Sequence, residues 1–471
     1  MTKAAPGLRA LKGLIWLYLV LLVFEGALRK WVLPSLATPL LIARDPLVML
    51  IYVVALSNKR FPVNGFVLAD VFLAMAAFIG GLLSPYSNIL VTLIGLRCYF
   101  LHLPLIFVME RTLNRDDVFR LGKFLLWAAV PITVLVVAQY YAPQSNWVNL
   151  DVGGIITAGM PGADNRFRPS GTFSFTTGVG EFYPLVLAIL LGFLLSDRKL
   201  WIILSVAAGL SVVVAVPFSI NRTNALTCAF VLVTGGVSLF FLPKPPVLIA
   251  RTILVSGAIV LILSQLSFFQ EGVTTFGDRW TGSTGTGKEG FRDAIVYRAL
   301  DDVTPPLDYI FDSDSLTGFG VGFGTNMASG LLTGQRSFSL GESEWPRLLL
   351  EMGPVLGVVF IGLRIALCGR LVMACLGALR RNNVVPILLG VEAVLLTLNS
   401  QWSQPTTLGF STFIAGLTFA ATRLPVDPST LAPPPRKIEA RWSPRPSQTW
   451  KPLGTPLPEP AEPSPVAGAT S

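Results

Sequence analysis

Long apolar stretches recur along almost the whole chain, and they constrain its fold more than any other feature. They run from Leu11 to Thr422 with few gaps, and a helix of about 20 such residues is long enough to cross a bilayer. Charged residues make up 13% of the sequence, about half the share of roughly 25% in soluble proteins. Because lipid leaves backbone groups no water to bind, spanning segments must be helices or closed barrels. We therefore expect an all-α polytopic membrane protein.

Counting these stretches predicts about 12 transmembrane helices. The predicted spans are Leu11–Leu28, Leu36–Leu56, Phe66–Leu83, Ile89–Met109, Phe124–Tyr141, Thr177–Leu195, Leu200–Val216, Ala225–Leu242, Val247–Leu266, Leu348–Leu367, Val384–Gln401 and Thr406–Thr422.

Lys and Arg gather in alternate short loops, and the positive-inside rule then places both termini in the cytoplasm. This orientation leaves two long segments outside, residues 142–176 and the large periplasmic loop 267–347 between helices 9 and 10. The membrane domain is expected over residues 1–423. Residues 424–471 are rich in Pro, Ser and Ala, which predicts a disordered cytoplasmic tail or, as an alternative, a segment that binds a partner.

The net charge of +9 does not indicate nucleic-acid binding, because the basic residues are scattered among the short loops. All four cysteines lie in or beside predicted spans, so we expect neither a disulfide framework nor a metal site. His102 is the single histidine of the chain and is expected to be packed or hydrogen-bonded. It follows Arg97 by five residues, so a regular helix would put the two on different faces.

Arginines inside or at the outer ends of spans are the first candidate site residues. Arg44 and Arg97 each lie about 8 residues into a span that runs inward, and Arg222 lies at the outer mouth of the eighth span. Guanidinium groups stay charged and bind phosphate oxygens with two donors, which suits a lipid-linked pyrophosphate. The alternative is structural pairing, of Arg44 with Asp45 or Asp70 and of Arg29 with Glu25.

The large loop contributes carboxylates and glycines. Glu342 and Glu344 immediately precede the tenth span, where a carboxylate can act as a general base toward a sugar hydroxyl or can stabilise the helix N-terminus. The glycine run Gly318–Gly324 lacks the strand, helix and GK[ST] context of a nucleotide loop. We expect it to allow close backbone packing or a bend near a ligand.

Three segments resemble the O-antigen ligase and O-antigen polymerase superfamily of bacterial membrane glycosyltransferases. Arg168-Pro169-Ser170-Gly171-Thr172-Phe173 is similar to its Arg-x-x-Gly-Thr-Phe element, and Asn221-Arg222 lies where the family has Ser-Arg. The run from Gly318 through Glu351-Met352-Gly353 is similar to its Gly-x-Gly, His-Asn, Glu-x-Gly signature. Counting back from Gly353, Glu342 stands where the family has its catalytic histidine.

The resemblance implies transfer of a glycan from undecaprenyl pyrophosphate to an acceptor hydroxyl at the periplasmic face of the bacterial inner membrane. It also implies a metal-independent reaction without cofactor. Arg222, with Arg44, Arg97 or Arg168, would hold the pyrophosphate, and Glu342 or Glu344 would take the proton. The expected partners are the bilayer, the lipid-linked glycan and polysaccharide assembly proteins. The alternatives are a secondary transporter, for which Glu392 beside Pro386 is the best indication, and a non-catalytic component of an export complex.

Overall fold

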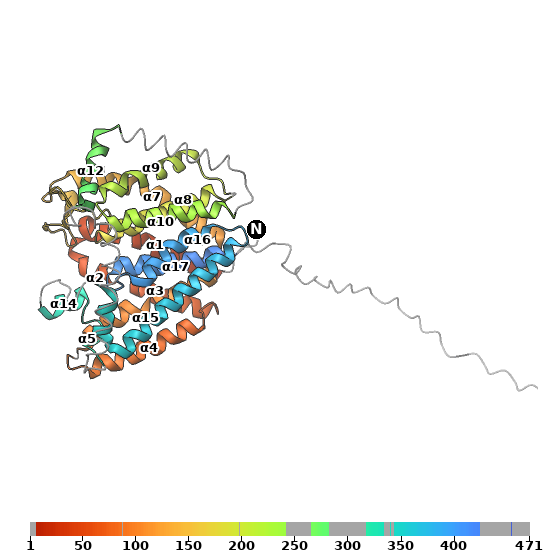
Figure 1. Ribbon diagram of the computed structural model, residues 1–471. Helices are drawn as coiled ribbons and strands as arrows, with labels where there is room; N and C mark the ends of the chain where they lie inside the picture. Colours follow the sequence, from red (N-terminus) through yellow and green to blue (C-terminus); the bar gives the residue numbers. More distant parts are fainter. Residues whose placement is uncertain are drawn as a thin grey trace, which may run out of the picture. The chain divides into compact units, whose positions relative to one another are not determined.

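The part of the protein that the structure describes is mostly helical, and its long helices pack side by side (Figure 1). The computed structural model describes residues 6–86, 88–196, 198–241, 265–281, 317–333, 340, 343–423 and 454. Isolated bridges, Asp151 with Ile155 and Pro161 with Phe167, are the only β pairing in these ranges. The expectation of an all-α chain is confirmed.

The helices before residue 142 are α1 (Pro6–Ala27), α2 (Ala37–Leu41), α3 (Arg44–Ser57), α4 (Gly65–Leu83), α5 (Ile89–Leu96), α6 (Leu103–Thr112) and α7 (Arg115–Tyr141). Two π-helical turns, η1 (Leu28–Val32) and η3 (Arg97–Leu101), and two 3₁₀ turns, η2 (Pro34–Leu36) and η4 (Trp147–Asn149), interrupt or follow them. The later helices are α8 (Thr177–Leu194), α9 (Ile202–Phe218), α10 (Arg222–Leu239), α12 (Ser267–Thr281), α14 (Asn326–Thr333), α15 (Glu344–Leu379), α16 (Val385–Asn399) and α17 (Pro405–Thr422).

Asparagine caps fix where several helices begin. The side chains of Asn64, Asn88 and Asn221 accept hydrogen bonds from backbone N–H groups in the first turns of α4, α5 and α10. Asn114 forms a reciprocal capping box with Asp117 at the start of α7. These contacts satisfy donors that a helix N-terminus otherwise leaves unpaired.

Within the residues that the structure describes, six helices are long and apolar enough to cross a membrane, and seven if the bent pair Pro34–Leu41 and Arg44–Ser57 forms one span. The six are Pro6–Val32, Gly65–Leu83, Ile89–Thr112, Arg115–Tyr141, Thr177–Leu194 and Glu344–Leu379. These helices are compatible with a membrane protein. Four further predicted spans coincide with α9, α10, α16 and α17, whereas Val247–Leu266 lies almost entirely outside the described residues. The count of 12 spans stays a prediction.

Burial divides the helices into central and peripheral ones. In α17 16 residues are buried, from Thr406 to Ala421, and this helix contacts α1, α6, α7, α8, α15 and α16. On α4, by contrast, large apolar side chains such as Phe72 and Leu83 are 67% and 71% exposed. An apolar helix exposed on one side suits a lipid-facing position, while one buried all round forms the core.

Candidate functional site

A cavity of about 650 Å³ opens at one end of the helices. Figure 1 shows α2 and α14, which both contribute to it, at the same end, away from the labelled N-terminus. Its lining combines two arginines and one carboxylate with small polar and apolar residues: Arg29, Thr38, Leu41, Arg97, Cys98, Asp151, Val152, Ser174, Phe175, Met327, Gly330, Leu331, Ser403, Gln404, Pro405 and Thr406. We call this the main cavity. A cationic end and an apolar wall suit an amphiphilic anion.

Arg29 reaches the main cavity from the π-helical turn η1. Its Nη1 lies 3.3 Å from Glu25 and donates to Ser174 Oγ at 2.9 Å, while its Nε donates to the carbonyl of Ala37 at 2.8 Å. The predicted i, i+4 pair with Glu25 is therefore confirmed. The same guanidinium also joins the first helix to the 142–176 loop, so it has a fixed orientation at the cavity wall.

Arg97 reaches the same cavity from the second π-helical turn, η3, and is paired with Asp45. The other oxygen of this carboxylate lies 3.0 Å from Nε2 of His102, whose Nδ1 lies 3.1 Å from the Tyr18 hydroxyl. His102 is buried and hydrogen-bonded, as expected. However, the expectation that Arg97 and His102 point apart is wrong, because π-helical hydrogen bonding brings residues i and i+5 into line.

Arg44 is buried behind the main cavity and does not line it. Its Nε donates to Glu25 at 2.8 Å and its Nη2 to the Pro405 carbonyl at 2.5 Å. Structural pairing was the predicted alternative, but the partner is Glu25 rather than Asp45 or Asp70. A Cβ at Gly409 would lie 1.9 Å from Nη1 of Arg44, so only glycine leaves room for this side chain.

A second, polar cavity of about 320 Å³ adjoins the main cavity and shares Asp151, Ser174 and Phe175 with it. Nine of its 16 lining residues have amide, hydroxyl, carboxylate or guanidinium side chains, which can hydrogen-bond sugar hydroxyls. Its other lining residues are Gln139, Gln144, Asn149, Leu150, Thr157, Ala158, Gly159, Met160, Phe167, Arg168, Pro169, Ser170 and Thr176. Arg168, predicted as a pyrophosphate ligand, thus lies in the polar cavity.

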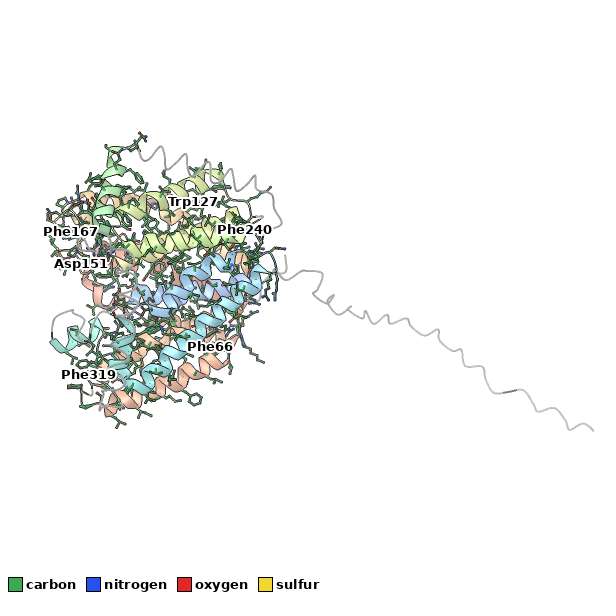
Figure 2. All side chains as sticks on the ribbon, viewed as in Figure 1. Phe66, Trp127, Asp151, Phe167, Phe240 and Phe319 are labelled. Atoms are coloured by element: carbon green, nitrogen blue, oxygen red, sulfur yellow. The ribbon has the colours of Figure 1, made fainter. Side chains whose placement is uncertain are left out.

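Asp151 stands where the two cavities meet, and Figure 2 shows it at the same end as Phe167 and Phe319. Its Oδ1 accepts a hydrogen bond from the Val152 amide at 2.7 Å, and Thr157 Oγ1 lies 3.4 Å from its Oδ2. Asp151 was not among the predicted site residues, because the candidate bases were sought beside the tenth span. The clustering of Gln, Asn and Arg around it in the 142–176 segment was the available signal.

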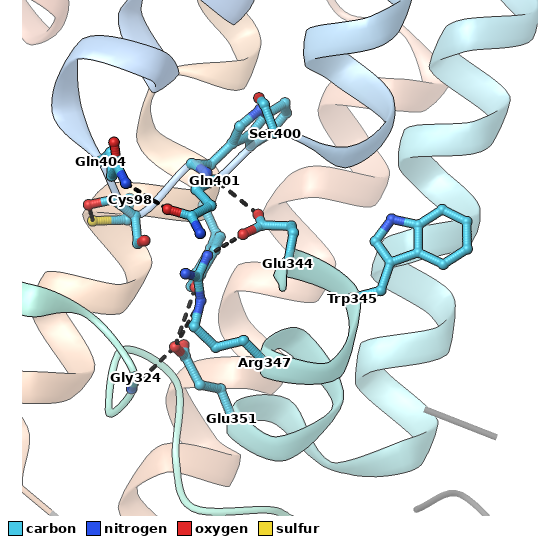
Figure 3. Close-up of polar contacts among 12 residues, drawn as sticks. Cys98, Gly324, Glu344, Trp345, Arg347, Glu351, Ser400, Gln401 and Gln404 are labelled. Carbon is cyan, nitrogen blue, oxygen red and sulfur yellow. Dashed lines mark hydrogen bonds and ion pairs between the residues drawn. The ribbon is translucent and has the colours of Figure 1, made fainter. Parts of the chain in front are cut away.

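A buried network of four charged side chains underlies the start of α15 (Figure 3). Glu344 is paired with Arg347, and its Oε1 accepts from Nη1 of Arg364 at 2.6 Å. It also accepts from the Trp402 amide at 3.3 Å. The side chains of Glu344, Arg347 and Arg364 are all 0% exposed. Glu344 therefore occupies a structural position away from both cavity walls, and its predicted role as base stays a prediction.

The glycine run is attached to the same network through Glu351. This carboxylate accepts hydrogen bonds from the amides of Gly322 at 2.7 Å and Gly324 at 3.0 Å. Gly322 has φ +92°, and a Cβ there would lie 2.3 Å from the carbonyl oxygen of Val91. The predicted role of the glycines in close backbone packing is confirmed.

The structure gathers only part of the predicted site. Arg97 lines the main cavity and Arg168 the polar cavity, while Arg222 begins α10 and lines neither. Glu342 lies outside the described residues. Arg29, one of the arginines at the outer ends of the predicted spans, and Asp151, which the sequence did not single out, also line the main cavity.

Ion pairs hold the charged side chains around the main cavity. Arg29, Arg44 and Arg97 share two carboxylates, Glu25 and Asp45, through the ion pairs described above. Asp151, which lines the cavity with Arg29 and Arg97, brings the carboxylates to three, so the positive and negative charges are equal in number. The two arginines of the wall offer N–H donors that can bind an anion. Comparison with known proteins finds no match, either among protein-family models or among curated sequences.

Proposed function

We propose that the protein is a membrane glycosyltransferase, a polymerase or ligase of surface polysaccharide that uses a glycan carried on undecaprenyl pyrophosphate. The observation that carries the proposal is the junction of two cavities, one cationic and partly apolar, the other polar. The resemblance of three segments to the O-antigen ligase and polymerase superfamily supports it. We place the site at the periplasmic face of a bacterial inner membrane, with both termini cytoplasmic.

In this proposal the main cavity holds the pyrophosphate and the first part of the lipid. Arg29 and Arg97 are the arginines of its wall, and guanidinium groups can bind phosphate oxygens with two parallel hydrogen bonds. Their charges oppose the negative charge that grows on the leaving group, which is where preorganised donors contribute most to the rate. Arg44 positions this wall through Glu25 and the Pro405 carbonyl.

The polar cavity would take the sugars. An acceptor hydroxyl attacks the anomeric carbon of the donor, a new glycosidic C–O bond forms, and the bond to the pyrophosphate oxygen breaks. The hydroxyl proton passes to a carboxylate. Asp151 is placed for this role at the junction of the cavities, and Glu342 is the rival candidate from the resemblance.

The test uses full-length protein in nanodiscs and radiolabelled lipid-linked oligosaccharide extracted from the native membrane. Arg29→Gln and Arg97→Gln are each expected to lower the transfer rate roughly 100-fold, the usual effect of removing one such donor. Arg120→Gln is the matched control, because the Arg120 side chain is 72% exposed and lines neither cavity. Thermal unfolding of each variant separates loss of chemistry from loss of fold.

The variant Arg222→Gln tests whether the main cavity or the sequence resemblance identifies the residues that bind the pyrophosphate. If the main cavity is the site, this variant transfers glycan at the wild-type rate. Full activity of Arg29→Gln and Arg97→Gln would refute the assignment of the cavity. Absence of transfer by folded wild-type protein would instead favour a non-catalytic component of an export complex.

One observation favours transport as a second candidate. Glu392 on α16 is buried, and neither of its carboxylate oxygens has a hydrogen-bond partner among the described residues. Such a carboxyl inside a membrane marks a path for protons or cations in many transporters. Solute uptake into proteoliposomes that Glu392→Gln abolishes, without glycan transfer by the wild type, would support this function.

A further inference from the structure

A third cavity, of about 580 Å³, lies at the opposite end of α3 and α17 from the main cavity. The main cavity includes Leu41, before α3, and Pro405, the first residue of α17. The third cavity instead includes residues that follow these two helices. We call it the basic cavity; it is lined by Asn58, Lys59, Arg60, Asn64, Glu110, Arg111, Arg370 and Arg423.

The charges of the basic cavity are strongly unbalanced. Five of its eight lining residues are Lys or Arg and one is a carboxylate, Glu110. Glu110 is already engaged, because both its oxygens lie 3.0 Å from Nη2 of Arg370. Four positive charges therefore remain around a concave space. Their mutual repulsion is relieved most directly by a bound anion.

Backbone contacts hold three of these cations in place. Nη1 of Arg60 donates to the Arg111 carbonyl at 3.0 Å, and Nη1 of Arg111 donates to the Phe61 carbonyl at 3.1 Å. Nη1 of Arg423 lies 2.9 Å from the Glu110 carbonyl. Each of these contacts uses one nitrogen of a group that has five N–H donors. The guanidinium groups are thus positioned before any ligand binds.

Arg370 forms a rigid floor for the cavity. Its guanidinium carbon lies 4.8 Å from the ring centre of Phe107, 4.9 Å from that of Phe419 and 5.5 Å from that of Phe66. Figure 2 shows Phe66 well away from Asp151 along the helices. Cation–π contacts of this kind hold a guanidinium in one orientation.

The surroundings of the basic cavity indicate a lipid rather than a soluble anion. Its residues lie at the end of Ile89–Thr112 and at the start of Gly65–Leu83. Both helices are long and apolar enough to span a membrane. Exposed apolar side chains flank them in the chain: Leu56 is 58% and Val63 71% exposed. Basic pockets between transmembrane helices at the membrane surface bind anionic lipid head groups.

We infer that the basic cavity binds the phosphate of an anionic phospholipid from the adjacent leaflet, with Arg60, Arg111 and Arg423 as ligands and Lys59 nearby. The acyl chains then cover the exposed apolar residues beside it. This site is independent of glycan transfer, because it shares no lining residue with the other two cavities.

Native mass spectrometry of the full-length protein tests the inference, with phosphatidylglycerol and phosphatidylcholine as probes. The wild type is expected to retain phosphatidylglycerol in preference to phosphatidylcholine. In the double variant Arg60→Gln/Arg111→Gln this preference should fall at least about tenfold, because two of the basic groups that attract the anionic head group are lost. Arg120→Gln, which removes an exposed charge outside the cavity, should keep it.

Two further measurements test the inference even if the double variant unfolds. Arg111→Lys retains the charge and should retain most of the preference, whereas Arg111→Gln alone should reduce it. Isothermal titration with inorganic phosphate should give no saturable binding in the range where the lipid binds. Equal retention of the two lipids, or tight binding of free phosphate, would overturn the inference.

Discussion

Arg364 donates a hydrogen bond of 2.6 Å to Glu344, and the two side chains are both fully buried although they are 20 residues apart on one helix. They can meet because α15 consists of two helical segments joined at Gly353, whose backbone is non-helical, with φ 76° and ψ 169°. Arg364 also lies over the Trp402 ring at 4.4 Å. The network therefore joins the start of α15 to the loop between α16 and α17.

This pair leads to the first prediction. Glu344→Gln should lower the free energy of unfolding by about 3–5 kcal/mol, because it leaves the buried Arg364 without a carboxylate partner and Arg347 with Glu351 alone. Thermal unfolding in detergent measures it. Asp116→Asn, which removes a 41% exposed partner of Arg198, should cost about 1 kcal/mol or less. A Glu344→Gln protein with wild-type stability but no transfer activity would instead establish Glu344 as a catalytic base.

The second prediction concerns Asp151. Asp151→Asn preserves an acceptor for the Val152 amide but cannot take a proton, so it should lower glycan transfer by roughly 100-fold or more without lowering stability. Initial rates with labelled donor measure the effect. Glu342→Gln, assayed in parallel, should leave the rate unchanged. The opposite pattern would assign the base to the later loop.

The glycine run gives a third prediction. Gly322→Ala should destabilise the protein by about 1–3 kcal/mol, because φ +92° is strained for alanine and its Cβ would overlap the Val91 carbonyl. The matched control is Gly236→Ala in α10, where no atom lies within 4 Å of an added Cβ. That change should be neutral or stabilise by up to about 1 kcal/mol. Equal unfolding temperatures for the two variants would contradict the proposed role of the close contact.

A fourth prediction concerns divalent cations. If Arg29 and Arg97 supply the positive charge that the leaving pyrophosphate needs, transfer should continue at an unchanged rate after dialysis against a chelator. Steady-state rates before and after EDTA treatment measure this. A loss that added Mg²⁺ restores would show that the arginines do not act alone.

The helices could be predicted from the sequence because lipid solvation requires long apolar runs, and eleven of the predicted spans coincide with helices of the structure. The break between Leu41 and Arg44, with a bend of 42°, was not predicted. A local signal was present, because Arg44, Asp45 and Pro46 follow the break directly, and proline favours the first turn of a helix. The pairing of Arg44 with Glu25, on a different helix, could not be read from the local sequence.

The candidate site was less predictable for the same reason. The sequence identified Arg97 but could not show that the π-helical turn at Arg97–Leu101 aligns it with His102 on Asp45. The local sequence does not show where a π turn forms. The contact with a distant residue, here Asp45, decides its position. Arg222 matched a short motif, yet motif position alone says nothing about which cavity a side chain reaches.

The complete burial of α17 has a consequence for how the protein assembles during synthesis. Six earlier helices surround α17, so they enclose a vacant core position until residue 422 has left the ribosome. Arg44, behind the main cavity, depends on α17 as well, through its hydrogen bond to the Pro405 carbonyl. Truncation before Pro405 should therefore yield an incompletely packed bundle that is prone to degradation.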